Sequence, residues 1–165
     1  MAAGNVDSPV SPVPETQGEV ETKNKSTVEA LYKALVKGYI EIVAKLLASD
    51  LEWWFHGPPQ CHHMMKVLTG ETTHDNVFRF EPRSITAIGD CVIAEGWEGK
   101  AYWVHVWILK GGLITQFREY FNTWLVVRDL RPPKWEAKEE SSLTLWQSQP
   151  RDLYHRSLPG LLLAI

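Results

Sequence analysis

The chain has 165 residues, of which 44% are hydrophobic and 22% charged, and its net charge of −3 goes with a pI of about 6.1. This composition is typical of a globular protein with one well-developed core, and its slight negative charge argues against nucleic acid as a partner, because phosphate binding needs a basic face. No apolar run approaches the roughly 18 residues of a membrane span, and the N-terminus lacks the apolar stretch of a secretory signal, so we expect no membrane span and a cytoplasmic location, with entry into the nucleus left open.

Two helices are expected at the start of the folded part. Residues 1–25 are rich in proline and acids and have little apolar surface to bury, so we expect a disordered tail. A helix should begin at Ser26, which forms a capping-box pattern with Glu29, and should end at Gly38. A second helix is expected over residues 39–49, again with apolar residues at helical spacing.

Strands separated by tight glycine turns follow the helices. The aromatic stretch 50–57 predicts a strand that "GPP" ends, and residues 60–77 predict a strand or irregular turn followed by a loop. Four more strands are expected, at residues 78–89, 90–99, 101–110 and 113–127. Because two-residue turns separate most of them, they predict an antiparallel meander. The fold class is therefore α+β, with N-terminal helices packed on a curved, mostly antiparallel sheet.

The domain organisation follows from these elements. Residues 26–130 should form the folded domain. Residues 131–165 begin with the charged, proline-bounded stretch "RPPKWEAKEESS" and end in "SLPGLLLAI", so we expect a charged linker and an apolar tail that folds back.

Counting residues away from the Gly111-Gly112 turn gives a register for the last two strands. With a two-residue loop, His105 lies opposite Arg118, and residues directly opposite share a face. One face then combines polar groups with tryptophans: Trp103, His105, Trp107, Gln116, Arg118, Tyr120, Asn122 and Trp124. Glu95 and Glu119 fall on the other face, at an interface or a solvated edge. A count through Gly99-Lys100 places the small Ala94 and Gly96 beside His105 and Trp103.

The mixed face indicates an internal pocket between helices and sheet, since pockets are mainly apolar with a few placed polar groups. The opposite face is also apolar, and a second copy of the chain is the simplest cover for it, so we expect a homodimer.

Several side chains are candidates for the site. His105 could act as a base or an acid near neutral pH, or could simply pack between tryptophans with one hydrogen bond. Arg118 and Tyr120 could hold a ligand oxygen, or could make structural contacts. These three are the candidate catalytic residues. The candidate ligand contacts are Asn122, Trp103, Trp124, His56 and Trp54.

Metal and thiol chemistry have little support. His56, His62, His63 and His74 match no metal motif, and no nucleotide motif is present, so we expect neither a metal nor a cofactor. Cys61 and Cys91 predict no disulfide, which fits a reducing compartment. Cys61 with a neighbouring histidine is disfavoured as a nucleophile, because adjacent side chains rarely face each other.

The segments "EWWFHGPP", "LTGE", "KGGLITQFREYFNT" and "SLPGLLLAI" together resemble the plant wound-induced protein 1 family, within the nuclear-transport-factor-2-like and SnoaL-like superfamily. The resemblance covers roughly residues 27–165. It implies a cone-shaped α+β fold around a deep apolar pocket, commonly as a homodimer, and a link to wounding, stress and senescence. Asn122 departs from the pattern, because acid–base members of the superfamily often carry an aspartate there and an amide cannot carry a proton.

Two functions remain open. The first is a small-molecule pocket protein for an apolar metabolite, with or without a cofactor-free proton shift, cyclisation or dehydration. The second is a non-catalytic dimeric binding or scaffold module in the stress response, which the missing aspartate favours.

Overall fold

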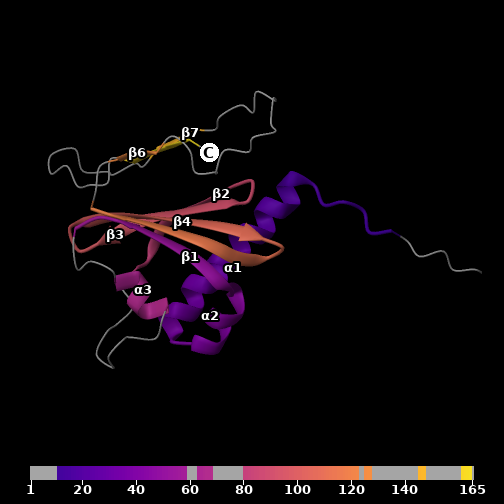
Figure 1. Cartoon of the computed structure of the whole chain (residues 1–165), viewed down its shortest axis with the longest axis horizontal. Coiled ribbons are helices and arrows are strands. Elements are labelled where there is room, and N and C mark those ends of the chain that lie inside the picture. Colours follow the sequence, from indigo (N-terminus) through magenta and orange to yellow (C-terminus); the bar gives the residue numbers. More distant parts are fainter. Residues whose placement is uncertain are drawn as a thin grey trace, which may run out of the picture.

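The computed structural model describes residues 11–58, 63–68, 80–122, 125–127, 145–147 and 161–164, arranged in three layers (Figure 1). A five-stranded sheet forms the middle layer. Helices cover one face, and a small three-stranded sheet lies on the other side. The predicted α+β class, with N-terminal helices on a mostly antiparallel sheet, is confirmed.

Helix α1 (Gln17–Lys37) begins nine residues before the predicted start. Its capping box is formed by Thr16 and Glu19, so the predicted box at Ser26 was wrong, and residues 17–25 of the expected tail are helical. The early start has a physical reason, since Asn24 is 6% exposed and contacts the sheet. Gly38 ends the helix as predicted, in the left-handed conformation with φ of 70°.

Two short helices complete the helical layer. Helix α2 (Ile40–Leu46) lies within the predicted range and buries Val43. Helix α3 (His63–Leu68) was not predicted, because we expected a strand or irregular turn there. Its residues include the good helix formers methionine, lysine and leucine. Met64 is fully buried against the core, so packing as well as propensity favours the helix.

The large sheet has the strand order β1-β5-β4-β3-β2. Its strands are β1 (Leu47–His56), β2 (Pro82–Ile88), β3 (Cys91–Glu98), β4 (Ala101–Lys110) and β5 (Leu113–Phe121). Strands β2 to β5 form the predicted antiparallel meander, and β1 pairs with β5 in parallel. The meander turns at Gly89, Gly99 and Gly111-Gly112, where φ of 57° to 80° suits glycine.

The strand predicted over residues 113–127 is two strands. β5 ends at Phe121, and Asn122 adopts φ of 46°, a left-handed conformation that asparagine tolerates better than most residues. The backbone N–H of Asn122 donates to the carbonyl of Tyr102 over 2.9 Å. Strand β6 (Leu125–Val127) then belongs to the small sheet.

A β-bulge in β5 changes which side chains share a face. Lys110 pairs with Leu113 as predicted, and Leu109 pairs with Ile114, but Ile108 pairs with Gln116. Thr115 is therefore an extra residue, and its hydroxyl donates to the Ile108 carbonyl over 3.2 Å. Beyond the bulge, every side chain of β5 lies on the face opposite to the predicted one.

The small sheet has the order β6-β8-β7, with β7 (Leu145–Gln147) and β8 (Leu161–Ala164). β8 pairs with β6 in parallel and with β7 in antiparallel orientation. Trp146 packs on an apolar cluster that faces away from the helices, formed by Cys91, Ile93, Tyr102, Val104, Val106 and Tyr120. A segment of the same chain thus covers part of the face for which we expected a second copy.

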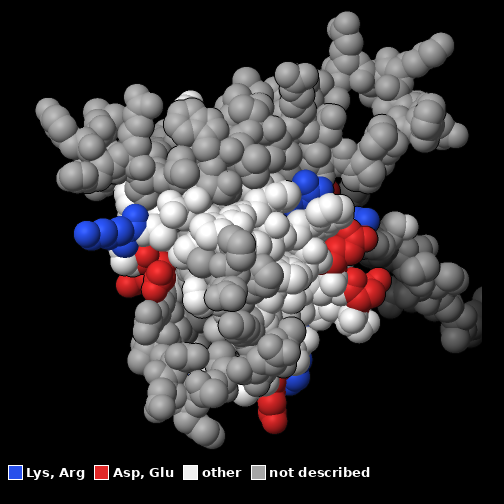
Figure 2. All heavy atoms as spheres, turned by 60° about the vertical axis from the view of Figure 1, so that its left-hand side comes forward, with Lys and Arg blue, Asp and Glu red and all other residues white. Residues whose placement is uncertain are grey.

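In the view of Figure 2, the charged side chains of the described residues lie toward the rim, and the described residues at the centre are uncharged. On this view, acidic and basic groups of the described residues lie near one another at several points along the rim. Such mixing is typical of an ordinary protein surface.

Candidate functional site

Three elements bring four side chains together on the helix-covered face of the sheet. His105 lies in the middle of β4, and its Nε2 atom is 2.8 Å from Oε2 of Glu119, its cross-strand neighbour on β5. On the other side of the imidazole, the Tyr32 hydroxyl of α1 lies 2.6 Å from Nδ1. Trp107 donates its indole N–H to the same hydroxyl over 3.1 Å. We call Tyr32, His105, Trp107 and Glu119 the inner cluster.

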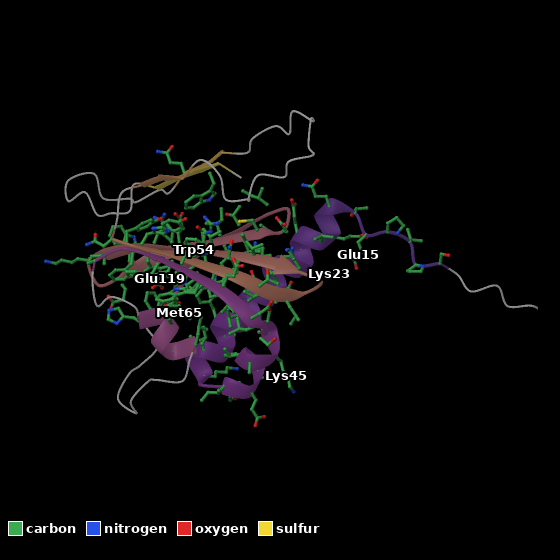
Figure 3. All side chains as sticks on the ribbon, in the orientation of Figure 1. Glu15, Lys23, Lys45, Trp54, Met65 and Glu119 are labelled. Carbon is green, nitrogen blue, oxygen red and sulfur yellow. The ribbon has the colours of Figure 1, made fainter. Side chains whose placement is uncertain are left out.

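The inner cluster is buried. His105, Trp107 and Glu119 are 0% exposed and Tyr32 is 4% exposed. In Figure 3, Glu119 lies on the side of the sheet that faces α3 and Met65, whereas Trp54 lies on the side of the small sheet. A buried carboxylate is rare in a protein core unless it is paired or has a function.

Aromatic rings enclose the imidazole of His105. The ring centroid of Trp103 stacks 4.2 Å away, and the rings of Phe80 and Phe117 lie at 5.1 Å. We call Trp103, Phe80 and Phe117 the aromatic shell. All three are buried. Within the described part of the chain, side chains therefore fill the space around His105. The predicted internal pocket stays a prediction.

The hydrogen positions in the cluster follow from burial. Burial lowers the pKa of His105 below its usual 6.5, and the Glu119 carboxylate opposes this only in part. The imidazole is therefore neutral near pH 7 and carries one hydrogen. A carboxylate oxygen 2.8 Å away favours that hydrogen on Nε2, which leaves Nδ1 to accept from the Tyr32 hydroxyl. Burial also raises the pKa of Tyr32 well above 10.0, so the phenol keeps its proton.

Part of the polar capacity of the cluster is unused. Although Nε2 and Oε2 are close, neither makes a hydrogen bond of good geometry, and Oε1 of Glu119 makes none either. The indole N–H of Trp103 also has no partner. Each buried unsatisfied group costs roughly 1–3 kcal/mol. Such a concentration is typical of a functional site, where polar groups serve something other than stability.

Gly96 fixes the position of Trp103. The two residues are cross-strand partners on β3 and β4, as the count through Gly99-Lys100 predicted. A Cβ atom at Gly96 would lie 2.8 Å from Cζ2 of Trp103 and 2.7 Å from the Glu81 carbonyl oxygen. The absence of a side chain therefore allows the indole to lie flat against the strand.

The structure separates the predicted site residues into two groups. His105 and Trp103 lie on the helix-covered face as predicted. The prediction that Arg118 and Tyr120 share that face was wrong, because the bulge at Thr115 turns them to the opposite side. The same bulge brings Glu119 inward, so its predicted place on the far side was also wrong.

Four predicted residues do meet, but on the far side of the sheet. The guanidinium of Arg118 lies 5.6 Å from the ring centroid of Trp54, which is 51% exposed. His56 stacks on Tyr120 at 4.8 Å. Burial lowers the pKa of His56, and the Arg118 charge adds to that shift. Burial raises the pKa of Tyr120, against the effect of Arg118. We call Trp54, His56, Arg118 and Tyr120 the outer cluster.

Glu95 lies on the outer face as predicted, but it is 6% exposed and not at a solvated edge. Its Oε1 atom accepts from Arg83 over 3.2 Å and from Ser84 over 3.0 Å, and Tyr102 donates to its other oxygen. With this many partners, Glu95 has a structural explanation that Glu119 lacks.

Among the described residues, no other candidate belongs to the inner cluster. Asn122 is exposed at the end of β5, so the structure gives it no ligand-orienting position. Trp124, Cys61, His62 and His74 lie outside the described residues. His63 packs its ring 6.0 Å from Phe121.

Sequence reasoning missed Tyr32 and the inward place of Glu119. Tyr32 lies in the apolar stripe of α1 with Val28 and Leu35, and a hydroxyl on a buried face needs a partner. That requirement was a usable signal. The spacing of apolar residues along β5 does not predict the bulge at Thr115.

Neither a group of metal ligands nor a membrane-spanning helix occurs in the described part of the chain. It holds no group of three or more histidine, cysteine, aspartate or glutamate side chains that could bind a metal. None of its helices is both long and apolar enough to cross a membrane. A shallow hollow of about 420 Å³ lies at the start of α1, lined by Thr16, Gly18, Glu19, Thr22 and Lys23, and includes no predicted site residue.

The amino-acid sequence is similar to that of known plant proteins. The family model for wound-induced protein WI12 matches residues 65–165, which include His105 and Glu119 but not Tyr32. Wound-induced protein 1 of Solanum tuberosum is 36% identical over 110 residues, covering 61% of this chain and all of the relative. Senescence associated gene 20 of Arabidopsis thaliana gives the same identity and coverage.

A solved structure with a similar outline is an NTF2-like protein from Burkholderia xenovorans, with 19% identity and a TM-score of 0.48. The similarity covers 61% of this chain and 90% of that one. At this level it carries no functional inference.

Proposed function

Because the chain belongs to the wound-induced protein WI12 family, we propose that it is a wound- or senescence-associated protein that binds a small, largely apolar metabolite between the helices and the large sheet. The site is the inner cluster with its aromatic shell. The observation that carries the proposal is the unsatisfied polar capacity of Glu119 and Trp103 inside an otherwise apolar core. A ligand with an apolar body and one or two polar atoms would satisfy these groups.

The same site suggests which groups would move a proton if the bound molecule reacts. The Glu119 carboxylate is a base, and His105 carries a hydrogen on Nε2 beside it. Tyr32 holds the other ring nitrogen, which keeps the imidazole in this tautomer. This arrangement allows a cofactor-free proton shift. Arg118 and Tyr120 face away from it, so they have no part in this chemistry.

Entry to the site requires a side chain to move. The ring of Phe80 lies against both Trp103 and His105, at 5.4 and 5.1 Å. Phe80 lies two residues before the start of β2 at Pro82. It is 3% exposed, whereas Trp103 and Phe117 are 0% exposed, so it is the least buried residue of the aromatic shell. We expect Phe80 to swing aside when a ligand binds.

Thermal melting of the full chain with a panel of terpenoids, phenolics and alkaloids tests the proposal. A compound present at 100 times its Kd should add about 2.7 kcal/mol to the free energy of unfolding. The added stability should disappear in Trp103→Phe, which removes the indole N–H together with part of the ring, and should persist in Trp54→Ala, which alters only the outer cluster. If no compound stabilises the protein, or if Trp54→Ala abolishes binding instead, the inner site is wrong.

A second candidate is a dimeric scaffold without a ligand. Exposed apolar side chains at the junction of α1 and α2 favour it: Val36, Tyr39, Ile40 and Ile42 are 64%, 52%, 73% and 44% exposed. A second copy could cover them. Light scattering should then show a dimer that Ile40→Lys converts to a monomer, and a monomer at high concentration would remove this candidate.

A further inference from the structure

We infer that the ligand of the inner site is a cationic amine with an apolar or aryl body, a conclusion that rests on the proposed binding function. Glu119 supplies the only formal charge in the inner cluster. Among the described residues, no lysine or arginine contacts it, and its one close polar neighbour is His105. The charge of the cluster therefore decides which ligand charge it accepts.

The hydrogen-bond directions leave that negative charge uncompensated. The Trp107 indole can only donate, so the Tyr32 oxygen accepts from it. The Tyr32 hydroxyl donates in turn to Nδ1 of His105, which makes the imidazole neutral with its hydrogen toward Glu119. A neutral donor at 2.8 Å solvates a carboxylate but does not cancel its charge. An ionised Glu119 gives the inner cluster a net charge of −1, because its three other members are neutral.

The aromatic shell suits the same kind of ligand. Ring faces attract cations, and this attraction is strongest where water is excluded. Trp103, Phe80 and Phe117 all lie within 5.1 Å of the His105 ring, and His105 in turn contacts Glu119. An ammonium group could donate to Oε1 of Glu119 while its apolar body takes the place of Phe80 against Trp103.

Other charge types fit less well. A carboxylate ligand would meet Glu119 as a like charge in a site with little screening. A neutral alcohol could donate to Oε1 and accept from Trp103, so it satisfies the hydrogen bonds but leaves the charge unpaired. Charge, and not hydrogen-bond count, distinguishes an amine from an alcohol here.

Calorimetry on the full chain with three probes of matched body tests the inference: 2-phenylethylamine, 2-phenylethanol and 3-phenylpropanoate at pH 7. The amine should bind about ten-fold or more tightly than the alcohol, and the carboxylate least tightly. Glu119→Gln should erase the preference for the amine. Glu52→Gln, which removes an exposed carboxylate, should leave it intact.

Nuclear magnetic resonance of the unmodified protein supplies a second readout that needs no variant to fold. The amine should shift the Trp103 indole and His105 ring signals. If the alcohol binds as tightly as the amine, or if Glu119→Gln keeps the preference, the inference is wrong while the proposed binding site stands. If none of the three probes binds but a compound of the melting panel does, the inference again fails alone; if nothing binds at all, both fail.

Discussion

His105 and Glu119 face each other across β4 and β5 with 2.8 Å between Nε2 and Oε2, and neither side chain is exposed. Their contact is close but poorly aligned, so the carboxylate keeps oxygens that no group among the described residues satisfies. A pair built for stability alone would normally be completed by further hydrogen bonds, as the Glu95 group on the other face is. The contrast between these two buried carboxylates supports the ligand role proposed for Glu119.

Glu119→Gln should lower the pKa of His105 further. Glu119 is the group that raises this pKa, through the close approach of its carboxylate to Nε2 and through its charge, while burial lowers it. An uncharged amide keeps the size of the side chain and removes the charge. Titration of the His105 Cε1–H resonance measures the shift. An unchanged or higher pKa in Glu119→Gln, with Glu52→Gln as the control, would show that the carboxylate does not act on the imidazole.

The protein should lose stability as the pH falls below about 6.5, the usual pKa of histidine. The pKa of His105 is lower when folded than when unfolded, so acid protonates the unfolded chain first and favours unfolding. Between pH 6.5 and the lower folded pKa, this one group reduces the free energy of unfolding by at most about 1.4 kcal/mol for each pH unit of acidification. Above pH 6.5 it contributes no pH dependence.

Urea denaturation between pH 5 and 8 measures this slope. His105→Gln should flatten it, whereas His56→Gln should remove only the smaller part due to the less buried His56, whose pKa is also lowered. A slope that His105→Gln leaves unchanged would mean that folding does not lower the pKa of His105.

Gly96→Ala should destabilise the fold by about 1–3 kcal/mol, the usual range for overpacking. The new Cβ would lie 2.7 Å from a backbone oxygen, which cannot move aside as a side-chain tip can. Gly18→Ala is the matched control, because a Cβ there meets nothing within 4 Å and alanine suits a helix better. Chemical denaturation compares the two. Equal stabilities would show that Trp103 does not depend on Gly96.

Asn24→Ala should cost about 1 kcal/mol. The Asn24 amide donates to the Gly89 carbonyl over 3.3 Å, and Glu21 accepts from the Gly89 N–H over 2.8 Å, so the early turns of α1 hold the β2–β3 turn. Lys25→Ala changes an exposed neighbour and should have little effect. Helical content measured by circular dichroism should persist in both variants, and equal stabilities would contradict the role of Asn24.

Much of the fold was predictable because local signals determine it. Glycine turns at Gly89, Gly99 and Gly111 fixed the meander, and the apolar stripe of α1 fixed its buried face. The start of α1 was missed because its first turns are polar and depend on a distant contact at Gly89. Helix α3 was missed because a six-residue helix depends largely on what its methionines pack against.

The site was predictable only in part. The alternation along β4 placed His105 and Trp103 correctly, because β4 pairs with β3 without interruption. On β5 the same reasoning failed, because one unpaired residue reverses the faces of all the residues after it. The pattern of apolar residues along the strand does not reveal this unpaired residue. Tyr32 lies 73 positions from His105 in the sequence, and only the packing of α1 on the sheet brings the two together.

The extra residue Thr115 shifts the pairing of β5 by one position and so reverses the face on which each later side chain lies. A chain without that residue would turn the arginine and tyrosine at 118 and 120 toward the helices and Glu119 toward the small sheet. The interior would then hold a guanidinium in place of a carboxylate, with the remaining composition unchanged. In a scaffold of this kind, a single insertion or deletion in one strand is therefore enough to reverse the charge of the side chains that face the interior, with no substitution elsewhere.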